Sequence, residues 1–178
     1  MDQYSLRRTD AQKNQFSWDR QMREDPFRTI EYTAPASAND LPVAYQTDGV
    51  FTPAFTGETS PTDVMCGGVP VLNGSRFGVA YNDVKLGEKS SVVVDGKGML
   101  LVPAAITWED GDKAYLIPFA TEETGGLITN TDGGGANIQI GQFVGASTDA
   151  DSRKVVSSLS PLRLPDGCYG KIWWFPTV

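Results

Sequence analysis

The sequence predicts an all-β fold, a small β-barrel or sandwich of short antiparallel strands that carries an extended N-terminal arm. Short runs of β-branched and aliphatic residues recur along most of the chain, separated by turn residues, and the 178 residues include 19 Gly and 11 Pro. Helical periodicity is almost absent. About nine to eleven strands at this short spacing are typical of a barrel or a sandwich.

Residues 1–45 differ in composition from the rest and are expected to form an arm and linker ahead of a β domain over residues 46–178. This segment contains no glycine and mixes charged residues with isolated large apolar ones. Ser17 is placed to cap a short helix that ends before Pro26, and the small residues and prolines of residues 33–42 indicate a linker. A helix of one or two turns is unstable alone in water, so the arm needs a surface on which to pack.

The first strands of the body are short and are joined by turns that contain glycine. Strand-like pieces occur within residues 50–66, and the Asn-Gly pair at 73–74 stands between two apolar runs, which is the strongest hairpin signal in the chain. Three more runs fill residues 76–102. Their separators, Leu-Gly-Glu at 86–88 and Asp-Gly-Lys-Gly at 95–98, both predict turns that fold one strand back on the next.

The second half of the body continues the same pattern. A turn is expected at Asp110-Gly111-Asp112, and a glycine-rich turn at 133–135. Further strands are expected within residues 113–117, 125–130, 137–146, 159–164 and 170–176.

The last strand combines three large aromatic residues. Alternation along a strand that completes the barrel points Ile172 and Trp174 inward and Trp173 and Phe175 outward. We expect the outer pair to contact another subunit, because exposed aromatic patches typically mark contacts. The alternative is that both faces of the strand are covered within one monomer.

Charge and cysteine content limit the possible partners and compartments. The net charge is −7, and because residues 1–31 hold six basic and six acidic side chains, the excess of acid lies in the rest of the chain. An acidic body lacks the positive field that nucleic acids require, so no nucleic-acid partner is expected. No signal peptide and no apolar run long enough to span a membrane are found, which predicts synthesis in a cytosol and no membrane partner. Cys66 and Cys168 are expected to be buried free thiols.

The sequence contains no histidine, which excludes the usual catalytic triads and most zinc sites. The acidic residues Glu109, Asp110 and Asp112 are expected in a turn rather than in a glycosidase-like pair. Residues 148–152 resemble a fragment of a calcium loop but lack its glycine and distant Glu, so a surface turn is expected there too. The sequence therefore predicts no catalytic residue, no cofactor and no metal, and an enzyme is the least favoured interpretation.

A succession of short motifs runs through residues 46–164. The motifs are Gly78-Val79-Ala80, Leu86-Gly87-Glu88, Val92-Val93-Val94-Asp95-Gly96, Asp110-Gly111-Asp112-Lys113-Ala114-Tyr115, Leu127-Ile128-Thr129-Asn130 and Ile140-Gly141-Gln142-Phe143-Val144-Gly145. In order and spacing they resemble the capsid cement proteins of tailed bacteriophages, whose cadence is Gly-Val-Ala, Gly-Glu, a Val-rich strand ending in Gly, Gly-Asp-x-Val-Tyr and Ile-Gly-x-Ala. Each motif alone is common in the turns and strands of β-hairpins, so the resemblance rests on the whole series.

The resemblance implies a structural virion protein with a small β-barrel-like domain. Such a protein is made in the cytoplasm of the bacterial host and binds the outer surface of the phage head. There it cements neighbouring major capsid proteins, often as a homotrimer, and it has no catalytic residues. This chain departs from the compact family pattern in its long charged arm and its aromatic tail.

The arm is expected to reach across a seam between capsid subunits. Extended, about 40 residues span up to ~130 Å at ~3.3 Å per residue. The side chains expected to contact the capsid are the large apolar residues and arginines of the arm: Tyr4, Arg7, Arg8, Phe16, Trp18, Arg20, Met22, Arg23, Phe27 and Arg28. The main alternative function is a carbohydrate- or receptor-binding β domain of a virion fibre or an adhesin, with the aromatic residues as stacking platforms.

Overall fold

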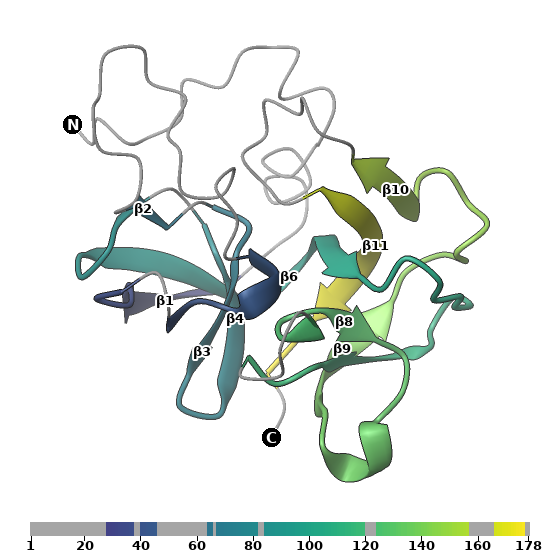
Figure 1. The fold of residues 1–178 in the computed structure, drawn as a ribbon, viewed down its shortest axis with the longest axis horizontal. Helices are drawn as coiled ribbons and strands as arrows, with labels where there is room; N and C mark the ends of the chain where they lie inside the picture. The colour runs from purple at the N-terminus through teal and green to yellow at the C-terminus, as the bar shows by residue number, and fades with distance from the viewer. Residues whose placement is uncertain are drawn as a thin grey trace.

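The computed structural model describes residues 28–37, 40–45, 64–65, 67–81, 84–119, 124–156 and 166–176. Within these residues the predicted all-β fold is confirmed: an antiparallel sheet curls into a half-barrel (Figure 1). The predicted strands at 50–56 and 159–164, the helix after Ser17 and the side chain of Cys66 lie outside the described residues.

The described residues form eleven strands and two short 3-10 turns. The strands are β1 (Arg28–Thr33), β2 (Val64–Met65), β3 (Pro70–Asn73), β4 (Arg76–Ala80), β5 (Val84–Lys85), β6 (Lys89–Val102), β7 (Lys113–Leu116), β8 (Ile128–Thr129), β9 (Ile138–Phe143), β10 (Arg153–Val156) and β11 (Gly167–Trp174). The 3-10 turns are η2 (Val43–Tyr45) and η5 (Gly133–Gly135).

The 14-residue strand β6 connects the two parts of the sheet. Its first half pairs with β1 and β4, and its second half pairs with β11. The main path of the sheet therefore runs β3-β4-β6-β11-β9-β7-β8, with β1 beside β6 and β10 beside β11 (Figure 1). Strands β2 and β5 form a separate pair.

The predicted turn at Asp95-Gly96-Lys97-Gly98 is wrong, because these residues continue β6 without a break. Gly96 leaves space for neighbouring side chains and does not reverse the direction of the chain. A Cβ atom there would lie 2.7 Å from a methyl carbon of Val93 and 3.1 Å from the ring of Trp174. In sequence, a glycine that makes room for a tryptophan and a glycine that forms a turn look alike.

Other predicted turns are confirmed. Strands β3 and β4 form a hairpin in which Asn73 pairs with Arg76, and Gly74 takes a φ of 64°, a left-handed conformation that favours glycine. The Leu-Gly-Glu segment at 86–88 joins β5 to β6, and Gly111 lies in the turn before β7.

Part of the segment that the sequence assigns to the arm and linker packs on the sheet. Strand β1 pairs with β6 from Arg28 to Thr33. Beyond it, Leu41 and Tyr45 are buried in the core, and the Ala44 N–H donates to the Gly125 carbonyl (N to O 2.9 Å). The division of the chain between residues 45 and 46 stays a prediction.

The core fills the inner face of the curled sheet and also covers part of the outer face along β6 and β11, where Met99, Leu101 and Tyr169 are buried. Its largest fully buried side chains are Trp108, Trp174, Tyr45, Tyr169, Phe143, Met65, Leu100, Leu116 and Ile128. Cys168 is a buried free thiol, as predicted.

Candidate functional site

Four neighbouring strands bring polar and aromatic side chains into one row across the outer face of the sheet. Trp173 of β11 pairs with Lys97 of β6 on one side and with Gln142 of β9 on the other, and Gln142 in turn pairs with Lys113 of β7. Directly paired residues of a sheet share a face, so the four side chains project to the same side. The next residue, Trp174, projects to the inner face and is fully buried.

Trp173 is the centre of this row. Its side chain is 42% exposed, and its ring meets the ring of Phe175 edge-to-face with centroids 5.6 Å apart. The predicted alternation in the last strand is therefore confirmed. The indole N–H of Trp173 donates to Asp95 Oδ1 (Nε1 to Oδ1 3.4 Å), which holds the ring over β6. That Trp173 and Phe175 contact another subunit remains a prediction.

Three basic side chains lie on the same face as the rings of Trp173 and Phe175. Lys97 and Lys113 lie in the row itself, and Lys171 precedes Trp173 by two residues on the same face. We call this surface the Trp173 platform, and it consists of Lys97, Lys113, Gln142, Lys171, Trp173 and Phe175. Among the paired residues of the described strands, Asp95 is the one carboxylate that contacts the platform, through the indole N–H of Trp173.

The base of the predicted arm lies beside the platform. Arg28, the first residue of β1, is exposed and is the register partner of Asp95, the residue that accepts from Trp173. Two groups that the sequence kept apart, an arm arginine and the aromatic tail, are thus neighbours in the fold. The remaining predicted arm contacts, Tyr4 to Phe27, lie outside the described residues.

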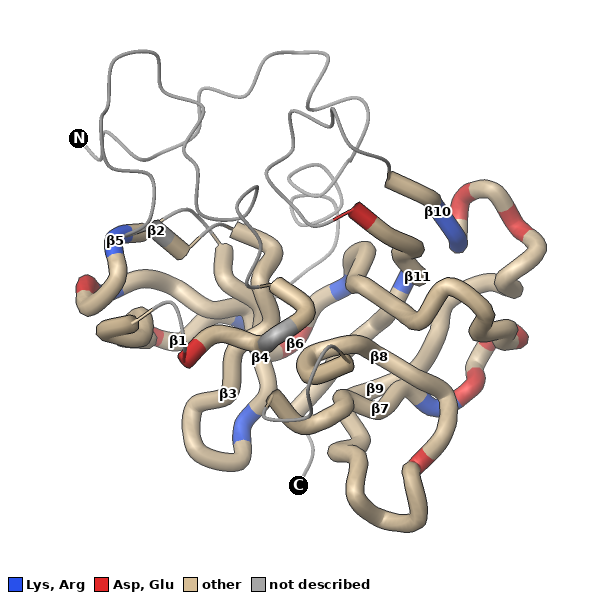
Figure 2. Tube along the Cα trace, in the orientation of Figure 1, with Lys and Arg blue, Asp and Glu red and all other residues tan. Residues whose placement is uncertain are grey.

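A second charged surface lies at the end of the sheet, where two turns are joined. Asp110 Oδ1 accepts from the Gly145 N–H (N to O 2.7 Å), and the Ser147 N–H donates to the Trp108 carbonyl (2.9 Å). The acidic residues carried by these turns are Glu109, Asp110, Asp112, Asp149 and Asp151. Figure 2 marks acidic positions in the turn before β10 and beside β7. We call this surface the acidic corner.

The carboxylates of the acidic corner stabilise turns, as the sequence predicts. Asp112 Oδ2 accepts from the Glu109 N–H (N to O 3.0 Å), while Asp110 holds Gly145. Two oxygens that each accept a backbone N–H are typical of turn residues. No group of three His, Cys, Asp or Glu side chains within the described ranges is arranged to hold a metal ion.

Arg153 of β10 anchors the acidic corner, and no local sequence signal points to it. Its guanidinium donates to the carbonyls of Ala104 and Ile106 and lies 5.6 Å from the ring centroid of Trp108. Trp108 in turn stacks on Phe143 with centroids 4.7 Å apart. The residues of these pairs are 35 to 49 positions apart in sequence, so only the fold brings them together.

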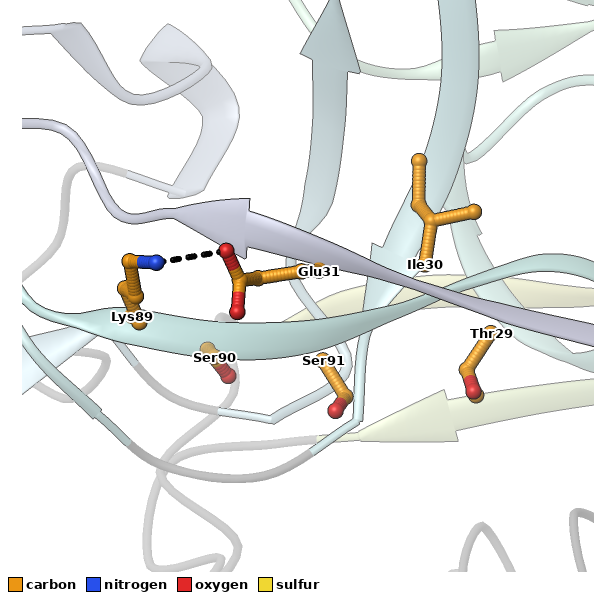
Figure 3. A pocket seen from close by; sticks show the side chains of 6 residues that line it. All are labelled: Thr29, Ile30, Glu31, Lys89, Ser90 and Ser91. Carbon is orange, nitrogen blue, oxygen red and sulfur yellow. Dashed lines mark hydrogen bonds and ion pairs between the residues drawn. The ribbon is translucent and has the colours of Figure 1, made fainter.

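A shallow groove of about 370 Å³ lies on β1 and the start of β6. Figure 3 shows its lining residues: Thr29, Ile30, Glu31, Lys89, Ser90 and Ser91. Its two charged groups neutralise each other, because Lys89 Nζ lies 2.7 Å from Glu31 Oε1 and both side chains are about 70% exposed. The groove offers hydroxyl groups but holds its one cation and its one carboxylate in a mutual ion pair.

Among the described residues, the fold raises the pKa of three tyrosines. Burial raises the pKa of Tyr45 and Tyr169, and the neighbouring Tyr45 and Asp166 raise that of Tyr169 further. Burial also raises the pKa of Tyr32. The Tyr45 hydroxyl accepts from the Leu101 N–H of β6 (N to O 3.1 Å), and this hydrogen bond lowers the pKa of Tyr45 against the larger effect of burial.

No protein-family model, curated protein sequence or solved structure matches this chain. Within the described ranges, no helix is both long and apolar enough to cross a membrane.

Proposed function

We propose that this chain is a structural virion protein that binds the outside of a tailed-phage head and cements neighbouring major capsid proteins. The series of motifs from Gly78 to Gly145 supports the family. One structural observation supports the mode of binding: Arg28, at the base of the arm, lies beside the exposed Trp173 platform through Asp95. The arm then contacts the capsid, while the exposed aromatic surface beside its base contacts a second copy of the chain, so that attached copies also hold one another.

The affinity of the arm for the capsid comes from a few large side chains. Ordering an arm costs conformational entropy, so a few large anchors supply the affinity. The arm outside the described residues contains such anchors in Phe16, Trp18 and Phe27, and arginines suited to bidentate contacts with carboxylates. In a shell of many copies, multivalent attachment then slows dissociation of the whole layer.

Deletion of residues 2–27 tests this proposal, and the boundary follows from the structure, because β1 begins at Arg28. Full-length protein mixed with empty heads of the phage that encodes it is expected to co-sediment with them, and the truncated protein is expected to remain in the supernatant. Circular dichroism and thermal unfolding of the truncated protein provide the control that the β body is intact. Full-length protein that stays in the supernatant overturns the cementing function. Truncated protein that saturates the heads overturns the role of the arm.

A carbohydrate- or receptor-binding function is the second candidate, and the exposed Trp173 with its neighbour Phe175 favours it. Exposed aromatic rings pack against the apolar C–H faces of sugar rings. A glycan array on which Trp173→Ala abolishes binding of the full-length chain would favour this function. An array without any bound glycan would reject it.

A further inference from the structure

The Trp173 platform has the opposite charge from the rest of the body. Residues 32–178 contain nine basic and sixteen acidic side chains, yet the platform gathers Lys97, Lys113 and Lys171 around two aromatic rings. Arg28 adds a fourth cation at its border. An aromatic centre within a charged rim is the composition of a protein interface, in which the rings supply buried area and the charges select the partner.

The acidic corner has the complementary composition. Glu109, Asp110, Asp149 and Asp151 are exposed there on two turns that hydrogen bonds join. The corner is also held rigidly, because Trp108 stacks on Phe143 and Arg153 ties the adjoining loop to β10. A rigid surface loses little conformational entropy when it binds.

We propose that the Trp173 platform of one copy binds the acidic corner of a second copy of this chain. This inference deepens the self-association within the proposed function and rests on it. Two platforms facing each other would bring their lysines together, and like charges at an interface disfavour that arrangement. The platform and the corner of two copies pair opposite charges, with Trp173 as the apolar anchor.

The charged contacts determine how this association responds to salt. Exposed ion pairs contribute little individually and are screened at a Debye length of about 3 Å in ~1 M salt. The association is therefore expected to weaken by roughly tenfold or more between low salt and ~0.5 M salt. Loss of the aromatic anchor by Trp173→Ser is expected to weaken it at every salt concentration.

Charge reversal in matched sets tests the assignment, with molar mass from sedimentation velocity as the readout. Lys97→Glu with Lys113→Glu makes the platform acidic, and Glu109→Lys with Asp149→Lys and Asp151→Lys makes the corner basic. This second set leaves intact the turn hydrogen bonds that Asp110 and Asp112 accept. Each full-length variant alone is expected to lose self-association, while an equimolar mixture of the two is expected to regain it, because the acidic platform of one then meets the basic corner of the other.

Lys85→Glu with Lys89→Glu is the control, since it changes the net charge equally at β5 and the start of β6, away from the platform. This variant is expected to keep the mass of the unmodified chain. If Lys97→Glu with Lys113→Glu leaves the oligomer unchanged, the pairing of the platform with the corner is wrong, while self-association itself stands. An unmodified chain that is monomeric at about 100 μM overturns self-association as well. Co-sedimentation with heads is measured separately, so failure of the cementing function is distinguished from both outcomes.

Discussion

Trp173 and Trp174 are consecutive residues of one strand, yet the fold uses them in opposite ways. Trp174 is fully buried on the inner face of the sheet, and Trp173 is 42% exposed on the outer face. They lie in adjacent rows across β6, β11 and β9, opposite consecutive residues of each neighbouring strand. The two residues share their type and their strand and are adjacent along it. Their environments therefore differ only because they lie on opposite faces of the sheet.

The inner row is built from small residues so that Trp174 fits. Its register partners are Gly96 and Gly141, and Gly141 pairs with Ala114. The indole N–H donates to the Val93 carbonyl (N to O 3.0 Å), and Phe77 meets the ring edge-to-face with centroids 6.4 Å apart. Buried area and a satisfied N–H together make this side chain a source of stability.

The outer row is built from long polar residues, and Trp173 leaves part of its ring in water. Its register partners are Lys97 and Gln142. Its N–H lies 3.4 Å from Asp95 Oδ1, a longer hydrogen bond than that of Trp174. The same side chain therefore contributes to folding on one face and remains available for association on the other.

Replacing each tryptophan by alanine gives the largest expected effect. Trp174→Ala removes a fully buried ring and leaves a cavity between two glycines that have no side chains to fill it, so a loss of about 3 to 5 kcal/mol in unfolding free energy is expected. Trp173→Ala is the matched control and is expected to cost less than about 1 kcal/mol. Denaturation by urea, followed by fluorescence of the remaining tryptophans, measures both. Equal losses in the two variants would contradict the comparison.

Alternation along the last strand was enough to predict which tryptophan lies inside. It needed only the period of two that every strand imposes. The sequence did not reveal the partners. Local signals do not show that Gly96 makes room for the ring of Trp174, or that the Tyr45 hydroxyl accepts from the distant Leu101 N–H.

For the charged surfaces too, features that depend on neighbouring residues were predictable from the sequence, and features that depend on distant residues were not. The acidic turn at Asp110-Gly111-Asp112 was predictable, since Asp and Gly are the usual turn residues. The platform was not, because Lys97, Lys113 and Trp173 come from three separate strands that only the register aligns. Arg153 was missed for a related reason: its role depends on carbonyl groups of a distant loop.

A methyl group on the inner row is the second test. In Gly141→Ala the new Cβ would lie 2.0 Å from the Trp173 carbonyl oxygen, so the paired backbones of β9 and β11 must separate. Overpacking of this kind is expected to cost roughly 2 to 3 kcal/mol. Gln142→Ala, the neighbouring position on the outer row, is the control and should change the urea midpoint little. A fully stable Gly141→Ala protein would show that the inner row tolerates bulk.

A buried and an exposed polar group can be compared in the same way as the two tryptophans, and the expected changes in unfolding free energy are the smallest. Tyr45→Phe removes the hydroxyl that accepts from the Leu101 N–H inside the core, which leaves a buried donor without its partner and is expected to cost about 1 to 2 kcal/mol. The exposed Lys89 and Glu31 pair is the outer counterpart, and Glu31→Gln is expected to change stability by less than about 0.5 kcal/mol. Urea denaturation at neutral pH measures this difference.

The dependence on pH distinguishes loss of the hydroxyl from loss of packing. Burial raises the pKa of Tyr45 above its ordinary value near 10, so above that pH the unfolded chain releases a proton that the folded chain keeps. Tyr45 therefore stabilises the fold fully below pH ~10 and progressively less as the pH rises above it. Because Tyr45→Phe removes this proton, its unfolding free energy should fall less steeply than that of the unmodified chain between about pH 10 and 12, while Tyr169 keeps a residual slope in both. Parallel slopes would mean that the Tyr45 hydroxyl ionises as readily in the folded chain as in the unfolded one, and that the core does not exclude water at this position.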